Sequence, residues 1–333
     1  MSHTTLVITS IAAPNAVLRA FADGCTAKGI DFVLIGDKPS PTNFSLPGCD
    51  FWSLERQQEM PFALARLLPE RHYGRKNLGY LQAIKQGAQV ILESDDDNFP
   101  RPTFWDQRTR EQHTASLVGT GWVNLYRYFS QEPVWPRGFP LEHLQDPIPV
   151  PPAGTSTVCP IQQGLADENP DVDAIYRLVG RLPLNFEPRE LPVSLGAGAL
   201  CPFNSQNTTW FREAFPLLYL PSYCSFRMTD IWRSYVAVRI CWENGWDVLF
   251  HNATVWQERN AHDLMKDFAD ELIGYQHNKA ITARLAALAL KAGPEHIGAN
   301  MKACYAEFMA MGLIGTEETA LLDAWLADLS TLG

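Results

Sequence analysis

Residues 88–98 read AQVILESDDDN, and this stretch decides the expected fold. Its first seven residues form an apolar, partly β-branched run that is typical of a short buried strand. The run passes directly into Asp95, Asp96 and Asp97. Because open α/β sheets bind ligands at the carboxyl ends of their strands, acids in this position indicate both the class of sheet and the place of its site.

Two further apolar runs, at residues 4–11 and 31–37, predict strands upstream. Between them apolar residues recur at helical spacing up to Gly29, a residue type that commonly ends helices. This strand–helix–strand order predicts parallel strands joined by a right-handed crossover. Since residues 75–86 predict another helix before the third strand, the first third of the chain reads as an open, mostly parallel α/β sheet with flanking helices.

In the rest of the chain some segments predict a helix or a strand and others predict neither. Residues 100–200 are rich in loops and proline, and no strand can be bounded in them. Residues 226–246 predict a helix, and residues 247–256 predict a strand. From residue 263 to residue 333, periodic stretches rich in Ala and Leu predict a helical extension of two to four helices.

The overall composition disfavours several classes of partner. The chain has 333 residues, 46% of them hydrophobic, and its net charge of −10 argues against nucleic acid and anionic membrane surfaces. No apolar run approaches the roughly 20 residues of a membrane helix, and the N-terminus does not resemble a signal peptide. Seven cysteines without a CxxC pair predict reduced thiols. We therefore expect a soluble, cytoplasmic protein with no membrane span.

The three adjacent aspartates carry the main chemical prediction. In an extended backbone Asp95 and Asp97 would point to one side and Asp96 to the other. Two carboxylates on one side suit Mg²⁺ or Mn²⁺, which prefer oxygen ligands and leave positions open for phosphate oxygens. The alternative is a solvated acidic turn. The position directly after a buried strand favours the metal site.

Further polar candidates lie near the same edge of the expected sheet. Thr9 and Ser10 end the first strand and Asp37 ends the second, so they suit contacts to a nucleotide base or ribose, although residues of these types also form ordinary turns. Arg75 and Asn77 stand at the start of the helix before the third strand. Basic side chains and free N–H groups at a helix start suit a phosphate, and a solvated first turn is the alternative.

The chain after residue 100 offers five more candidates. Arg137 lies in the Pro-locked loop WPRGFP and suits either a diphosphate or a rigid surface turn. Asp171, Asp173 and Asp230 suit acceptor binding or general-base catalysis, but acids before helices also serve as caps. His262 follows the last predicted strand and could complete a metal site, although a lone histidine is more often structural.

An ordered set of motifs resembles a known family. The segments are LVITSIAAPN, FVLIGDKPSP, RKNLGYLQAIKQGAQVILESDDDN, VWPRGFPL, NPDVDAIYRL, PFNSQNTTWF and FRMTDIWR. Together they resemble the STELLO-type glycosyltransferases and, more distantly, the reversibly glycosylated polypeptides, which are UDP-arabinopyranose mutases. The likeness spans about residues 4–265 and leaves the helical tail outside it.

The resemblance implies a GT-A fold, a UDP- or GDP-linked sugar donor and a divalent metal, Mn²⁺ or Mg²⁺. It implies Asp95 and Asp97 as metal ligands, and it places Asp230 and Trp232 near the sugar and the acceptor. Arg137 matches the arginine loop that becomes glycosylated in the mutases. Two departures stand out. The loop reads RGFPLE where the mutases have RGYP and a serine, and Gln257 follows Trp256 where the mutases have a histidine.

We therefore expect a GT-A-like catalytic domain over residues 1–262 and a helical extension over residues 263–333. The nucleotide-sugar half would span about residues 1–100 and the acceptor half about residues 101–262. The expected reaction moves a sugar to an unidentified hydroxyl acceptor, with Asp230 as the candidate base. Two alternatives stay open: a nucleotide-sugar mutase, and a non-catalytic scaffold that binds nucleotide sugars for other glycosyltransferases.

Overall fold

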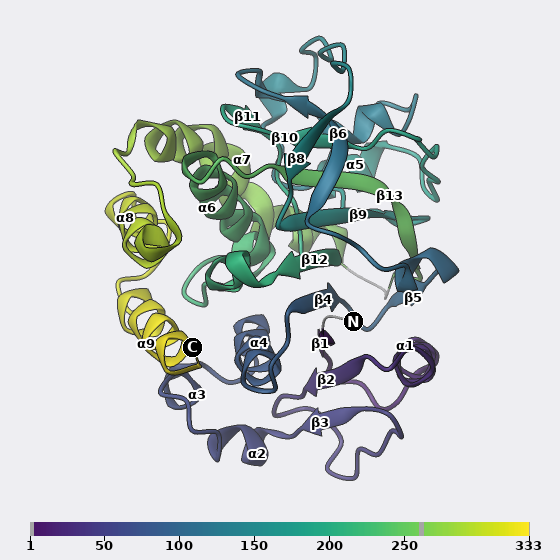
Figure 1. The fold of residues 1–333 in the computed structure, drawn as a ribbon, viewed down its shortest axis with the longest axis vertical. Helices are drawn as coiled ribbons and strands as arrows, with labels where there is room; N and C mark the ends of the chain where they lie inside the picture. Colours follow the sequence, from purple (N-terminus) through teal and green to yellow (C-terminus); the bar gives the residue numbers. More distant parts are fainter. Residues whose placement is uncertain (1–2, 260–262, 333) are drawn as a thin grey trace.

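One mixed β-sheet organises the computed structural model, which describes residues 3–259 and 263–332 (Figure 1). Within these residues the strand order is β3-β2-β1-β4-β12-β9-β13-β10-β6-β8, and β5 also pairs with β13. The strands are β1 Thr4–Thr9, β2 Asp31–Ile35, β3 Asp50–Trp52, β4 Val90–Ser94, β5 Asn98–Pro100, β6 Glu111–Leu117, β8 Thr155–Val158, β9 Ile161–Asp167, β10 Val193–Leu195, β12 Asn207–Phe211 and β13 Val248–Gln257. The short strands β7 (Gly121–Trp122) and β11 (Ala199–Leu200) form a separate pair.

Helices cover both faces of this sheet. They are α1 Ala16–Lys28, α2 Leu54–Gln58, α3 Leu64–Leu67, α4 Lys76–Lys85, α5 Ala174–Val179, α6 Thr229–Glu243, α7 Leu264–Ala287, α8 Ile297–Ala310 and α9 Glu318–Leu332. Alternate side chains of β1 show the two layers. Leu6 and Ile8 are buried in the cluster that contains α1, whereas Val7 is buried in the larger cluster that contains α4.

The first third of the chain folds as the sequence predicts. Strands β1, β2, β3 and β4 are parallel neighbours. Helix α1 begins after Asn15, whose side-chain oxygen accepts a hydrogen bond from the Leu18 N–H at 2.8 Å. It ends at Gly29, whose φ of 64° is a left-handed conformation that glycine adopts without strain. The predicted strands and helices of this part are confirmed.

The strands β6, β8, β9 and β10 lie in the loop-rich stretch where the sequence allowed no strand to be bounded. Strand β9 explains the miss, because it is buried throughout although it reads IQQGLAD. Gln163 is buried there because its amide donates to the Asn207 carbonyl at 3.1 Å and its oxygen accepts from the Asn204 N–H at 2.9 Å. A buried strand with satisfied polar side chains shows no apolar run.

The sheet changes from parallel to mixed at β12, which is antiparallel to both β4 and β9. The predicted α/β sheet with flanking helices and a C-terminal helical extension is confirmed. None of the helices in the described parts of the chain is both long and apolar enough to span a bilayer.

The C-terminal helices pack along one side of the molecule (yellow in Figure 1). The carboxylate of Asp328, on α9, accepts hydrogen bonds from the N–H groups of Ala63 and Leu64 at 2.9 Å each. These are the free N–H groups at the start of α3, so α9 supplies the cap that α3 lacks in its own sequence. The tail therefore contacts the amino-terminal third of the chain directly.

His251 on β13 predicts a pH dependence of stability. Burial lowers its pKa to about 3, so below pH 6.5 the unfolded chain takes up a proton that the folded chain does not, and stability falls as the pH falls. Because part of the residue reaches solvent, we expect wild type to lose about 1–2 kcal/mol more than His251→Gln between pH 7.5 and pH 5.0. Urea denaturation at both pH values measures this difference, and equal losses in the two proteins would contradict it.

Candidate functional site

A cleft of about 520 Å³ lies at the carboxyl ends of β1, β2 and β4. This is the edge at which the sequence predicted the site. The predicted residues that line the cleft are Thr9, Ser10, Asp37, Arg75, Asp95, Asp96, Asp97, Arg137, Asp171 and Asp230. Segments that are far apart in the chain therefore meet in one cleft.

The three aspartates lie in a tight turn between β4 and β5, and not in an extended strand. The Asn98 N–H approaches the Asp95 carbonyl at 3.4 Å and closes this turn. The expectation that Asp95 and Asp97 share one side of a strand is therefore wrong. The physical reason is that β4 stops at Ser94, before the first of the acids.

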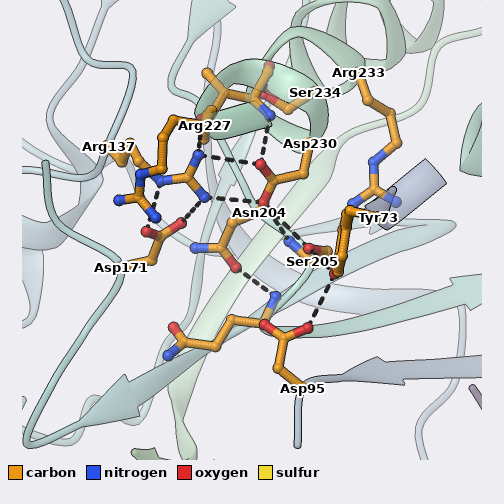
Figure 2. A network of polar contacts seen from close by, with 12 residues as sticks. Tyr73, Asp95, Arg137, Asp171, Asn204, Ser205, Arg227, Asp230, Arg233 and Ser234 are labelled. Atoms are coloured by element: carbon orange, nitrogen blue, oxygen red, sulfur yellow. Dashed lines mark hydrogen bonds and ion pairs between the residues drawn. The ribbon is translucent and has the colours of Figure 1, made fainter. Parts of the chain in front are cut away.

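Each aspartate of this turn contacts a different neighbour. Asp95 accepts a hydrogen bond from the Tyr73 hydroxyl at 3.0 Å (Figure 2). Asp97 accepts one from the Gln257 side-chain amide at 2.9 Å, and Asp96 accepts one from the Ser10 hydroxyl. The turn thus joins the ends of β1, β4 and β13 in a single cluster.

Burial governs the charge of this cluster. It raises the pKa of Asp95 to about 7, against the opposing charge of Lys76, and the pKa of Asp97 to about 6. The Lys76 ammonium lies 3.3 Å from Asp95 and is itself fully buried. Negative charge that is costly to hold in this way would be relieved by a cation.

The donor set fits a magnesium- or manganese-type ion. In the described residues, no group of three or more His, Cys, Asp or Glu side chains forms an all-protein metal cage. Mg²⁺ commonly binds through one or two carboxylates and takes its other oxygens from water and substrate phosphates. The aspartate turn offers carboxylates of this kind, and it faces a cleft with room for a diphosphate.

The strand ends beside the turn are also polar. The Ser10 N–H donates to the Ile35 carbonyl at 3.0 Å, which continues the β1–β2 pairing to the cleft. Asp37 accepts a hydrogen bond from the His72 N–H at 2.9 Å. Its carboxylate therefore links the end of β2 to the segment before α4, in addition to its place on the cleft wall.

Arg137 lies between two carboxylates on the opposite wall of the cleft (Figure 2). Its Nε and Nη2 donate to the two oxygens of Asp171 at 2.8 Å each, and Nη1 and Nη2 donate to those of Asp230 at 3.1 Å each. Nη1 also donates to the Arg227 carbonyl. All three nitrogens of the guanidinium are thus engaged, so glycosylation or phosphate binding at Arg137 would first have to open this arrangement.

The same contacts fix the charge of Asp230. Burial alone would raise its pKa, but the charge and hydrogen bonds of Arg137 outweigh burial and lower the pKa to about 2. The Ser205 N–H and hydroxyl donate to the same carboxylate at 3.1 Å and 3.2 Å. Asp230 is therefore a firmly held, ionised hydrogen-bond acceptor.

Gly138 follows this arginine and permits the turn of the loop. Its φ is +87°, and a Cβ at this position would lie 2.3 Å from Cγ2 of Ile231. We expect Gly138→Ala to lower the free energy of unfolding by about 2 kcal/mol, measured by urea denaturation. Gly119→Ala is the matched control, because Gly119 has a φ of +66° but nothing within 4 Å of its Cβ position. Equal losses in both variants would show that the contact with Ile231 is not the cause.

Several predicted residues are not brought to the open cleft. Asn77 exchanges two hydrogen bonds of 2.9 Å with the Leu220 backbone. Asp173 caps α5 by accepting from the Tyr176 N–H at 2.7 Å, which is the structural alternative raised for it. Trp232 is completely buried, and its indole N–H donates to a side chain of α7.

Arg75 and His262 are the remaining predicted residues. Arg75 lines the cleft, but its guanidinium donates to Gln57 at 2.8 Å and to the Leu68 carbonyl at 3.2 Å. Its side chain therefore supports the loop before α4. His262 lies outside the described residues.

Sequence reasoning missed other residues of the cleft, namely His72, Tyr73, Arg177, Phe226, Arg227 and Arg259. One signal was available for Arg259, which stands two residues beyond the end of β13. The others lie on or next to short helical turns or within α5, where periodicity does not distinguish a cleft residue from a surface residue.

The cleft lies where α/β sheets bind their ligands, and comparisons with known proteins identify relatives of the chain. Residues 227–333 match the model of the STELLO glycosyltransferases. The chain is 31% identical over 250 residues to Probable glycosyltransferase STELLO2 of Arabidopsis thaliana. The alignment covers 68% of this chain and 32% of that protein. The chain is also 31% identical over 244 residues to Probable glycosyltransferase STELLO1 of the same plant. That alignment covers 66% of this chain and 31% of STELLO1.

The chain is similar in sequence to the STELLO glycosyltransferases, and it spans about a third of the length of these curated relatives. The expectation that the helical tail lies outside the resemblance is wrong, because the family match runs through residues 263–333. Helical stretches rich in Ala and Leu are common to many proteins, so the tail carried no motif that could show the relationship from sequence alone.

Two solved structures are distantly similar. A mycobacterial protein has a TM-score of 0.41 at 11% identity, over 83% of this chain and 74% of that one. The glucosyl-3-phosphoglycerate synthase of M. tuberculosis has a TM-score of 0.41 at 10% identity, over 85% of this chain and 79% of that one. Likeness at this level carries no weight for the function.

Proposed function

We propose that this chain is a metal-dependent glycosyltransferase that moves a sugar from a nucleotide-diphosphate sugar, UDP- or GDP-linked, to a hydroxyl acceptor. One observation carries the proposal: the turn of Asp95, Asp96 and Asp97 opens into a cleft at the carboxyl ends of three parallel strands. In α/β sheets this is the position for a nucleotide.

Asp95 and Asp97 would hold the Mn²⁺ or Mg²⁺ ion, with Asp96 beside them. Such an ion, when bound, neutralises charge on a diphosphate leaving group. The ends of β1 and β2, with Thr9 and Ser10 on the cleft wall, would face the nucleoside.

The opposite wall would receive the sugar. Phe226 lines the cleft with 56% of its surface exposed, and an open aromatic ring suits stacking on a sugar face. Asp171 and Asp230 are held in place by Arg137 and suit hydrogen bonds from sugar hydroxyls. For Asp230 a binding role is favoured over proton abstraction, because an effective base at neutral pH has a pKa closer to 7.

The arrangement of Arg137 bears on the mutase alternative. Self-glycosylation requires a guanidinium nitrogen that can reach the sugar, and all three nitrogens of Arg137 are engaged. Transfer to an external acceptor is therefore the better supported function. Incubation with UDP-arabinopyranose alone separates the two, since a mutase makes the furanose isomer without any acceptor.

A thermal-shift screen tests the proposal. UDP, GDP and their sugar derivatives are added with Mn²⁺, with Mg²⁺ or with EDTA. A nucleotide at 100 times its dissociation constant stabilises the folded state by about 2.7 kcal/mol, so one nucleotide should raise the melting temperature only when metal is present. The proposal fails if no nucleotide raises it, or if EDTA leaves the shift unchanged.

A further inference from the structure

Three of the arginine side chains that line the cleft influence one another's charge, and the proposed function gives none of these three a role. Arg177 comes from α5, Arg227 from the turn η6 (Phe226–Met228), and Arg259 from the segment after β13. Burial and the nearby charge of Arg259 lower the pKa of Arg177 to about 10. Burial and the charge of Arg227 likewise lower the pKa of Arg259. Like charges brought this close indicate a place where an anion would be stabilised.

Carboxylates outside the cleft anchor two of these arginines. Arg227 donates through Nε and Nη2 to Glu271 at 2.9 Å and 2.7 Å, and Arg259 donates through Nη2 to Asp267 at 2.6 Å. Glu271 and Asp267 belong to α7 and do not line the cleft. The two guanidinium groups are therefore held from α7, outside the cleft, while the arginines themselves line its wall.

Arg177 has weaker support than the other two. Its Nη2 donates to the Pro170 carbonyl at 2.9 Å. Its Nε is buried without a hydrogen-bond partner in the described residues, and no carboxylate there forms an ion pair with it. A buried cationic donor that lacks a partner is costly unless a ligand supplies the acceptor.

The position of the cluster separates it from the expected nucleoside site. The Arg227 carbonyl accepts a hydrogen bond from Arg137, so the cluster adjoins the residues assigned to the sugar. The nucleoside is assigned to the other side of the cleft, at the ends of β1 and β2.

We propose that Arg177, Arg227 and Arg259 bind a carboxylate or phosphate group that is distinct from the nucleotide diphosphate. This acidic group belongs either to the acceptor or to the transferred sugar. The inference rests on the proposed function, because it takes the diphosphate to lie at the aspartate turn. It narrows the substrate class to reactants that carry an acid beyond the nucleotide.

Calorimetric titration tests the acceptor as the source. The protein is saturated with Mg²⁺ and with the nucleoside diphosphate that binds best, and glucuronate and glycerol phosphate are titrated against their neutral counterparts, glucose and glycerol. We expect the acids to bind and the neutral compounds not to bind. Arg177→Gln should weaken binding of the acids at least tenfold and change the affinity for the nucleotide less than twofold. Arg110→Gln, a surface variant outside the cleft, should leave both affinities unchanged.

A second titration tests the transferred sugar as the source. A preference of wild type for UDP-glucuronate over UDP-glucose that disappears in Arg177→Gln assigns the acid to the donor sugar. Arg259→Gln repeats both titrations if Arg177→Gln does not melt cooperatively.

The inference is overturned if wild type prefers neither the free acids nor the charged donor. It is also overturned if Arg177→Gln weakens binding of the nucleoside diphosphate by the same factor as binding of the acid. If no nucleotide binds, the acids are titrated alone. Arginine-dependent binding then supports this site while the proposed function fails.

Discussion

Asp97→Asn is expected to lower the rate of sugar transfer by roughly 100- to 1,000-fold. The substitution removes one negative charge from the aspartate turn, and its amide oxygen can still accept the hydrogen bond from Gln257. The shape of the turn is therefore retained while a charged cation ligand is lost. Nucleotide affinity should fall with it, and the affinity that remains should no longer depend on metal. Transfer kinetics and nucleotide titration over a range of Mn²⁺ concentrations measure both effects.

Asp323→Asn is the matched control for this variant. Asp323 forms an exposed ion pair with Lys302 on the helical tail, where a lost charge changes little. Its transfer rate and metal dependence should equal those of wild type. A wild-type metal response in Asp97→Asn would show that the aspartate turn does not bind the cation, and the proposed function would then lose its basis.

Arg137→Met is expected to lower the free energy of unfolding by about 3–5 kcal/mol at pH 7. Arg137 is buried between Asp171 and Asp230, and an apolar side chain of similar length removes the hydrogen-bonded counter-charge of both carboxylates. Arg110→Met removes an arginine from a half-exposed pair with Glu213 and should cost less than about 0.5 kcal/mol. Urea denaturation compares the two variants.

The cost of Arg137→Met should also depend on pH. In wild type the pKa of Asp230 is low, so its contribution to stability is present above the unfolded pKa of about 4 and is lost as the pH falls toward 2. Without Arg137, burial raises that pKa above the unfolded value, and the variant loses stability as the pH rises through it. The difference from wild type should therefore be smaller at pH 5 than at pH 7. A cost below about 1 kcal/mol at pH 7 would contradict the account of Arg137 as the counter-charge.

Local patterns in the sequence predicted the part of the cleft that depends on strand ends. Ser10, Asp37 and the three aspartates each follow a short apolar run, and parallel strands bring their carboxyl ends to one edge. No such rule covers Arg137, because its partners Asp171 and Asp230 are 34 and 93 residues away in the chain. Long-range ion pairs leave no local pattern that a single sequence reveals.

The strands in the middle of the chain could not be predicted for a related reason. The glutamines of β9 are polar by sequence but buried in the structure, because backbone groups of neighbouring segments satisfy them. Periodicity rules therefore cannot bound such a strand. The conformation at the three aspartates differs from the expected one because β4 ends at Ser94, one residue before Asp95. The rule that side chains alternate applies only while a strand continues.

Helix α9 has a consequence for how a ligand would be received. Its Asp328 holds the start of α3, and its Glu318 accepts hydrogen bonds from the N–H groups of Ser222 and Tyr223, just before the wall that carries Phe226. The last helix thus ties the amino-terminal third of the chain to the segment that leads into α6. Because these contacts form within the chain itself, a bound ligand would need less interaction energy to order the segment before Phe226, and more of that energy would remain for orienting the reacting groups.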